Sequence, residues 1–166
     1  CKMENNNKSI FEKVSFPYTY DLLKESLVAD SAYIARSVYD ISAEKSSVLP
    51  IIITEDDRDF IIARISRACV DIVTRLVAYI DEETQFDDEP YTFVLKLPSC
   101  RNVAIDMLIS HELHRAIVAH VLAGWYEMRL PEMAKRQWQL YEAAIAMVRH
   151  DVYMARSKVH RVGTYF

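Results

Sequence analysis

Glycine is almost absent from this sequence of 166 residues, which contains only Gly124 and Gly163. Glycine forms the positive-φ turns and close backbone approaches on which phosphate loops, nucleophile elbows and cofactor cradles depend. A chain with so little glycine has few means of building such sites. The composition therefore predicts helices joined by short connections, with no bound cofactor, no metal and no catalytic residues.

Cysteine and long hydrophobic runs are also scarce. Cys1, Cys69 and Cys100 form no CxxC pair and no disulfide framework, which is typical of a reducing, intracellular setting. Cys69 falls in an apolar helical stripe, where we expect a buried thiol. No apolar run approaches the roughly 20 residues that a membrane-spanning helix needs, and residues 1–8 lack the pattern of a signal peptide. We therefore expect no membrane partner.

The length and the ordinary balance of hydrophobic and charged residues predict one globular domain. We expect a flexible N-terminal arm over residues 1–16, a single helical domain over 17–159 and a C-terminal tail over 160–166. Within the arm, apolar residues such as Phe11 and Phe16 are able to dock on the domain.

Apolar periodicity predicts the first two helices. Leucines, isoleucines and valines at helical spacing place the first over about 18–41. The second, over 55–80, has the clearest start, because Thr54 is a suitable N-cap and three acids follow in the first turn.

Two further helices follow in the second half of the chain. The third, over about 101–129 after a Ser99 cap, is apolar nearly all round, which is typical of a central helix. The fourth begins at Pro131 and carries a heptad seam from Ala134 to Val159. The short break between them predicts a long antiparallel hairpin. The expected class is thus all-α, with about four main helices and one short extended or β element.

That extended element is Tyr91–Pro98, a segment rich in aromatic and β-branched residues with a proline at each end. A single strand cannot form a sheet, so it needs a partner. Ile51–Ile53, the N-terminal arm and a neighbouring subunit are the three alternatives. A neighbouring subunit as partner would favour self-assembly.

Charge is distributed unevenly along the chain. Residues 1–100 carry 11 Lys and Arg against 18 Asp and Glu, whereas residues 101–166 carry 9 against 6. Six acids crowd into 81–89, which we expect to be a loop, and basic residues gather between Arg149 and Arg161. These runs are either solvated surfaces or the two halves of a contact in which a basic tail meets the acidic loop of a neighbour.

Sequence motifs for metal binding or catalysis are weak or absent. His111 and His114 lie three residues apart with Glu112 between them, whereas the zinc-protease motif needs histidines four apart. No glutamate of 112, 127, 132 or 142 has a histidine three residues later, which excludes a ferritin-like di-iron site. There is no GxSxG sequence, and Cys100 has only its place near a helix start in favour of reactivity.

Two segments resemble a known family. Gly124–Arg129, with the sequence GWYEMR before a Leu-Pro break, is similar to a stretch of the head–tail connector and completion proteins of tailed bacteriophages. The basic stretch from Arg149 to Arg161, followed by Thr164–Phe166, resembles the C-termini of phage structural proteins. The resemblance implies a small, mostly helical, non-enzymatic subunit that forms rings beneath the portal. In that family a shorter segment follows the matching helix, whereas a long heptad helix follows it here.

The function expected from the sequence is therefore a structural subunit of a phage or prophage particle that assembles head-to-tail into a ring. Portal or tail subunits are the expected partners, nucleic acid is bound at most non-specifically, and the setting is the virion or the bacterial host cytoplasm. A helical regulatory or nucleic-acid-binding module is one alternative, and an enzyme with a site around His111 and His114 is another. The residues expected at the subunit interface are Asp87, Asp88, Glu89, Arg156, Lys158, Arg161, Tyr165 and Phe166.

Overall fold

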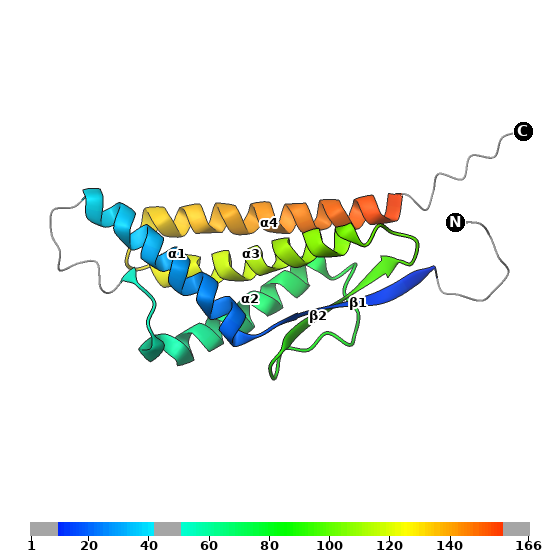
Figure 1. Ribbon diagram of the computed structural model, residues 1–166, viewed down its shortest axis with the longest axis horizontal. Helices are drawn as coiled ribbons and strands as arrows, with labels where there is room; N and C mark the ends of the chain where they lie inside the picture. The colour runs from blue at the N-terminus through cyan, green and yellow to red at the C-terminus, as the bar shows by residue number, and fades with distance from the viewer. Residues whose placement is uncertain (1–9, 42–50, 158–166) are drawn as a thin grey trace, which may run out of the picture.

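The computed structural model describes residues 10–41 and 51–157, which form four long helices and a two-stranded sheet (Figure 1). The mainly helical class with a small β element is as predicted. In chain order the elements are β1 (Phe11–Tyr18), α1 (Tyr20–Ile41), a 3₁₀ turn (Glu55–Asp57), α2 (Arg58–Leu76), β2 (Tyr91–Pro98), α3 (Ala104–Tyr126) and α4 (Pro131–Ser157).

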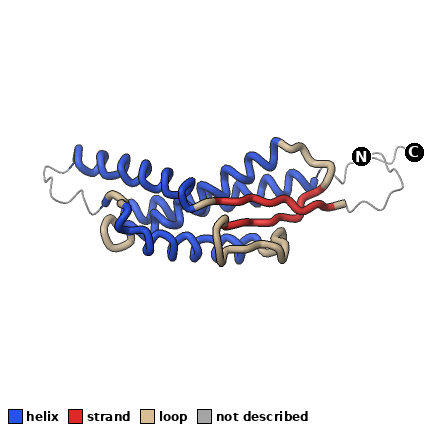
Figure 2. Tube along the Cα trace, turned by 60° about the horizontal axis from the view of Figure 1, so that its bottom comes forward, coloured by secondary structure: helices blue, strands red, loops and turns tan. Residues whose placement is uncertain are grey.

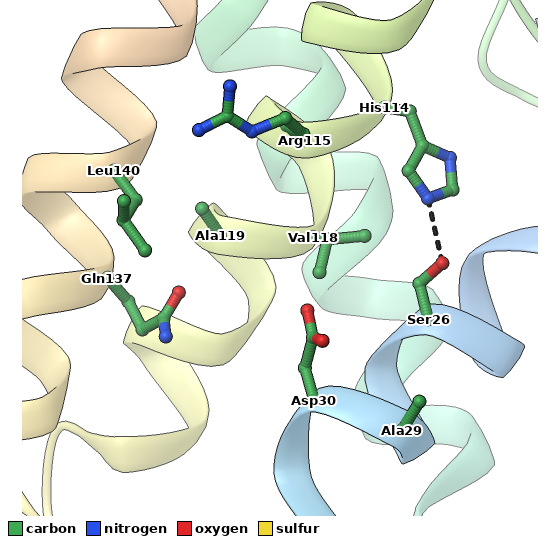
Figure 3. A pocket seen from close by; sticks show the side chains of 9 residues that line it. All are labelled: Ser26, Ala29, Asp30, His114, Arg115, Val118, Ala119, Gln137 and Leu140. Atoms are coloured by element: carbon green, nitrogen blue, oxygen red, sulfur yellow. Dashed lines mark hydrogen bonds between the residues drawn. The ribbon is translucent and has the colours of Figure 1, made fainter. Parts of the chain in front are cut away.

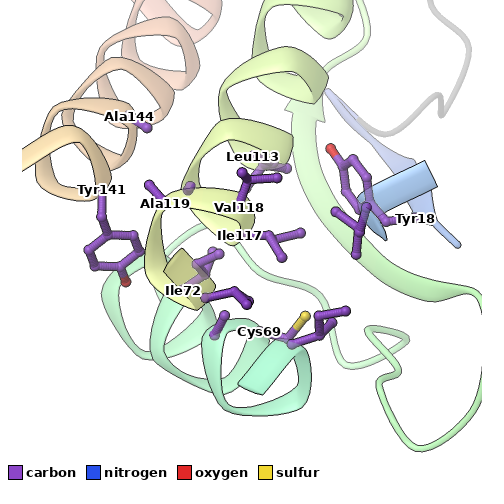
Figure 4. Packing of buried hydrophobic residues seen from close by; sticks show 14 of the residues in the cluster. Tyr18, Cys69, Ile72, Leu113, Ile117, Val118, Ala119, Tyr141 and Ala144 are labelled. Atoms are coloured by element: carbon purple, nitrogen blue, oxygen red, sulfur yellow. The ribbon is translucent and has the colours of Figure 1, made fainter. Parts of the chain in front are cut away.

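Helix α3 is the centre of the structure, as its apolar sequence predicted. It packs against α1, α2, α4 and β1, and its residues from Ala116 to Tyr126 are buried without a break. Figure 4 shows Leu113 and Ile117 of α3 in one apolar cluster with Cys69 of α2 and Tyr18 of β1. A helix needs apolar residues on every side only when other elements cover every side.

Helix α4 lies along α3 after the chain reverses at residues 127–130 (Figure 1). The heptad positions Tyr141, Ile145, Val148 and Val152 are all buried, as the seam predicted. Seen in Figure 4, Tyr141 and Ala144 of α4 lie beside α3. Regular heptad spacing therefore identifies the face of α4 that is covered by the domain.

The two strands pair antiparallel, from Phe11 opposite Pro98 to Tyr18 opposite Tyr91. Figure 2 shows them side by side along the helices. The prediction of a flexible arm is wrong for residues 11–16, which belong to β1. Alternation places Phe16 and Tyr18 in the core, and this burial holds the strand on the domain. Residues 1–9 lie outside the described residues.

The partner of the predicted strand therefore comes from the same chain. The other edge of β2 is covered as well, because Ile80 bridges to Leu95 and Gln85 bridges to Thr92. Ile51–Ile53, the alternative partner, forms no strand among the described residues; Ile51 and Ile53 are buried beside α3 and α1 instead. Of the three alternatives, the N-terminal arm is the partner, so the extended segment gives no support to self-assembly.

Helix boundaries differ from the sequence prediction by a few residues. The second helix ends at Leu76 and not at residue 80, and a 3₁₀ turn replaces its first turn. Thr54 does begin that turn, with its backbone N–H and hydroxyl both donating to Asp57. The third helix starts at Ala104, where Asn102 accepts the backbone N–H, so Ser99 is not its cap.

The residues Gly124–Arg129 lie at the C-terminal end of α3, where they pack against other parts of the chain. The Arg64 guanidinium lies where a side chain at Gly124 would be, 2.6 Å from the position of a Cβ atom. Trp125 Nε1 donates to the carbonyl oxygen of Ile51 at 2.8 Å, and Arg129 stacks over the Trp125 ring while donating to its carbonyl. The motif thus ties α2 and the segment before it to the end of α3.

Candidate functional site

A groove of about 270 Å³ lies where α1 crosses α3 and α4 (Figure 3). Helix α1 contributes Ser26 and Asp30, α3 contributes His114, and α4 contributes Gln137. The groove forms because α1 crosses the other two helices obliquely (Figure 1), so short side chains of α1 meet the α3 surface without filling the space. Its polar groups converge from three helices.

Ser26 and His114 form the one hydrogen bond within the groove that joins two of the described helices. Ser26 Oγ and His114 Nε2 lie 2.9 Å apart, and the imidazole tautomer decides which atom donates. Burial lowers the pKa of His114, and the nearby His111 lowers it further, so the neutral imidazole is favoured near neutral pH. The hydroxyl and the ring are both held in place by this bond.

The side chains of Asp30 and Gln137 have neither a hydrogen bond nor an ion pair to another residue that the structure describes. Gln137 is 7% exposed, and its amide lies at the groove (Figure 3). Partial shielding from water raises the pKa of Asp30, and His114 lowers it when the imidazole is protonated. Asp30 is exposed, so its carboxylate and the Gln137 amide oxygen are acceptors that a ligand in the groove can reach.

The apolar walls of the groove complete its chemical character. Val118 and Ala119 of α3 are buried beneath it, and Leu140 of α4 lies 39% exposed at its border. Arg115 turns away from Asp30 in Figure 3, and its guanidinium instead makes two hydrogen bonds of 2.9 Å to Glu112. The groove therefore offers acceptors and apolar walls, a combination suited to a long side chain or small molecule that ends in an ammonium or guanidinium group.

The three residues of the His-Glu-x-His pattern do not converge. His111 is exposed and lies 3.3 Å from Glu112, whereas His114 turns to Ser26 on α1. Within 10–41 and 51–157 no group of three or more His, Cys, Asp or Glu is arranged to hold a metal ion. The structure thus brings His114, but not His111 or Glu112, into the groove.

The acids of the run 81–89 differ in burial: Asp81 is buried, whereas the others are exposed. Asp81 is buried and pairs with Lys13 of β1 and Lys96 of β2, at 3.0 and 3.2 Å. The backbone N–H of Glu83 and these lysines lower the pKa of Asp81 to about 2. Because Lys13 and Lys96 are directly opposite each other in the sheet, Asp81 neutralises a like-charge pair.

The predicted interface acids also differ from one another. Glu89 accepts the backbone N–H of Tyr20, the first residue of α1, at 3.3 Å, a position that the helix dipole favours for an acid. It therefore has a structural partner within the chain. Asp87 and Asp88 are exposed and have no ion-pair partner in the described part of the chain.

The basic half of the predicted interface falls mostly outside the described residues. Arg156 belongs to the last turn of α4, and its side chain is not described. Lys158, Arg161, Tyr165 and Phe166 lie beyond residue 157.

Both described cysteines are free thiols. Cys69 is buried, as predicted, and burial raises its pKa to about 12. Cys100 is exposed in the turn before α3. Among the described helices, none combines the length and the apolar character that crossing a membrane requires.

The groove residues Ser26, Asp30 and Gln137 were missed by sequence reasoning. Asp30 lies four positions after Ser26, a spacing that places both on one face of a helix. That spacing was the only available signal, and it is common on solvated helix surfaces. Their meeting with His114 and Gln137 depends on how three helices cross.

Comparison with family models, with curated proteins and with solved structures finds no match for this chain.

Lowering the pH from about 7 to about 5 is expected to reduce the free energy of unfolding. Burial lowers the pKa of His114 and of His120, so the unfolded chain binds protons in this range more readily than the folded one. Stability is therefore present above the ordinary histidine pKa and is lost as the pH falls below it. Urea titrations across this range measure the slope. His120→Leu should flatten it, and an unchanged slope would contradict the assignment.

Proposed function

We propose that this protein is a non-enzymatic structural subunit of a phage or prophage particle, of the head–tail connector type, that associates head-to-tail with copies of itself. The observation that carries the proposal is the separation of unpaired acids from the end of α4. Asp87 and Asp88 lie where β2 begins and α1 starts, whereas α4 ends beside the opposite end of the sheet (Figure 1).

The acids near α1 form one surface, which we call the acidic face. It comprises Asp21 and Glu25 in the first turns of α1, together with Asp87, Asp88 and Glu89. Glu89 joins the loop to the start of α1 through the Tyr20 N–H. Lys24 is the single cation in residues 20–35, and it is already paired with Glu55. The face therefore attracts basic segments of a partner.

The sequence is basic from the last turns of α4 onward. Residues 149–161 contain Arg149, Arg156, Lys158 and Arg161 against a single acid, Asp151. Opposite charges at separate places on one subunit favour contacts between different surfaces of successive copies, and such contacts close into a ring when the rotation permits. The connector class itself comes from the resemblance of residues 124–129 and 149–166 to that family.

Light scattering coupled to size exclusion, followed by native mass spectrometry, tests this proposal. We expect assemblies at multiples of the 19.3 kDa subunit that dissociate as salt rises, because screening weakens contacts between exposed charges. Deleting residues 160–166 should lower the oligomeric order and leave the helix signal in circular dichroism unchanged. Asp87→Lys with Asp88→Lys should act in the same direction, and Glu82→Lys is the control, an exposed acid of the same loop outside the acidic face.

A 19.3 kDa particle at every protein and salt concentration would contradict self-association. A titration with duplex DNA separates the main alternative, the nucleic-acid-binding module. Affinity that falls steeply between 50 and 200 mM salt, as expected of about six or more phosphate contacts, would favour that alternative.

A further inference from the structure

We propose that the groove between α1, α3 and α4 receives the Arg161 guanidinium of a neighbouring copy of this chain. The inference rests on the head-to-tail association proposed above and identifies the receiving site of that contact. It follows from the carboxylate and amide that line the groove, from the charge around it and from the reach of the chain.

The groove holds two acceptors that a guanidinium group would satisfy together. The exposed Asp30 carboxylate has no ion pair among the described residues, and the Gln137 side chain has no hydrogen bond to another described residue although only 7% of the residue is exposed. The five donors of a guanidinium lie in a planar fork that matches a carboxylate and leaves donors for an amide oxygen. An ammonium group is compact and matches this arrangement less well.

The space and the walls fit the rest of an arginine side chain. The volume of about 270 Å³ lies just below the range of ordinary small-molecule pockets, which begins near 300 Å³, so it suits one long side chain. Val118, Ala119 and Leu140 provide apolar surface for the three methylene groups.

The approach to the groove is acidic. A second, more open hollow of about 590 Å³ lies on the other side of Ala29, which lines both. Asp21, Glu25 and Glu55 line this second hollow, with Lys24 as its single cation. A segment carrying several cations would thus be held along α1 while one of them enters the groove.

Chain geometry requires that Arg161 comes from a second copy. From Leu140 at the groove to Ser157 at the end of α4 is 17 residues of helix, about 26 Å at 1.5 Å per residue. Arg161 follows Ser157 by four residues, which extend at most about 14 Å of backbone. The chain's own Arg161 therefore cannot return to its groove, whereas that of a neighbour arranged head-to-tail can enter it. Lys158 directly follows Ser157 in the sequence, so fewer residues separate it from the described part of α4.

A charge exchange tests the assignment, with the dissociation constant of the assembly measured by sedimentation or mass photometry. We expect Asp30→Lys and Arg161→Glu each to weaken association by about tenfold or more, and the two together to restore it to within about threefold of the original. Asp30→Lys combined with Lys158→Glu is the matched control, and it should not be restored. Melting curves and circular dichroism verify that each variant is folded.

If Asp30→Lys does not fold, Asp30→Asn removes the negative charge and Gln137→Leu removes the amide, both with little change in size, and each should weaken association by about threefold or more. Association that is unaffected by these variants would overturn the groove as the receiving site while leaving head-to-tail association intact. Restoration by Lys158→Glu as well as by Arg161→Glu would overturn the choice of Arg161. A parent chain that does not associate at all would overturn both this inference and the proposed function.

Discussion

Replacing Phe16 with alanine is expected to lower the free energy of unfolding by about 3–5 kcal/mol, the usual cost of truncating a buried phenylalanine. Phe16 is 4% exposed and lies on the core side of β1, opposite Phe93 of β2. Its loss would leave a cavity between the sheet and the helices and weaken the attachment of the whole strand. Urea denaturation followed by circular dichroism measures the effect.

Phe11→Ala is the matched control, because it removes the same side chain from the same strand. Phe11 is 42% exposed, so we expect a loss of less than about 1 kcal/mol. Equal effects of the two substitutions would contradict the burial pattern of β1. A negligible effect of Phe16→Ala would return residues 11–16 to the flexible arm that the sequence predicted.

Replacing Trp125 with alanine should also destabilise the protein by about 3–5 kcal/mol. Trp125 is 3% exposed, its ring contacts Phe60 of α2 edge-on, and its indole N–H satisfies the buried carbonyl oxygen of Ile51. The substitution would create a cavity and leave that carbonyl unsatisfied, and both changes cost free energy. Thermal and denaturant unfolding measure the loss.

Trp125→Phe helps to separate the two contributions, because it removes the hydrogen-bond donor but keeps an aromatic ring and so leaves a smaller cavity than alanine does. We expect a loss of about 1–3 kcal/mol for this variant. Met128→Ala, at a residue of the same motif that is 91% exposed, should change stability by less than about 0.5 kcal/mol. A large loss from Met128→Ala would show that the motif has a structural role beyond the contacts described.

The contrast within Gly124–Arg129 bears on the resemblance to connector proteins. Gly124, Trp125 and Arg129 are used in contacts that hold α2 and Ile51 against α3. Such contacts explain the motif by packing alone. Support for the connector class must therefore come from self-association, which the light-scattering and charge-exchange experiments measure.

Regular patterns in the sequence were sufficient to place the helices. The heptad spacing of α4, the apolar residues around α3 and the acids after Thr54 each reflect local geometry or the simple partition of side chains between core and solvent. Tyr91–Pro98 was also predicted with its observed boundaries, because its composition favours a strand and prolines flank it. These features depend on residues close together in the chain.

Contacts between distant segments could not be read in the same way. The eight residues Phe11–Tyr18 became a strand because β2, some 80 positions later, offers hydrogen bonds and a hydrophobic face. Asp81 looked like part of an exposed acidic run, yet Lys13 and Lys96 surround it. The identity of such partners is a property of the folded arrangement.

The charged stretches and the groove differ in the same way. Sequence alone was enough to identify an acidic stretch and a basic C-terminal stretch, since charge is visible residue by residue. The groove around Asp30 appears only when α1 crosses α3 and α4, because Asp30 lies more than 80 positions before His114 and Gln137 in the sequence and the crossing of these helices is set by side-chain packing.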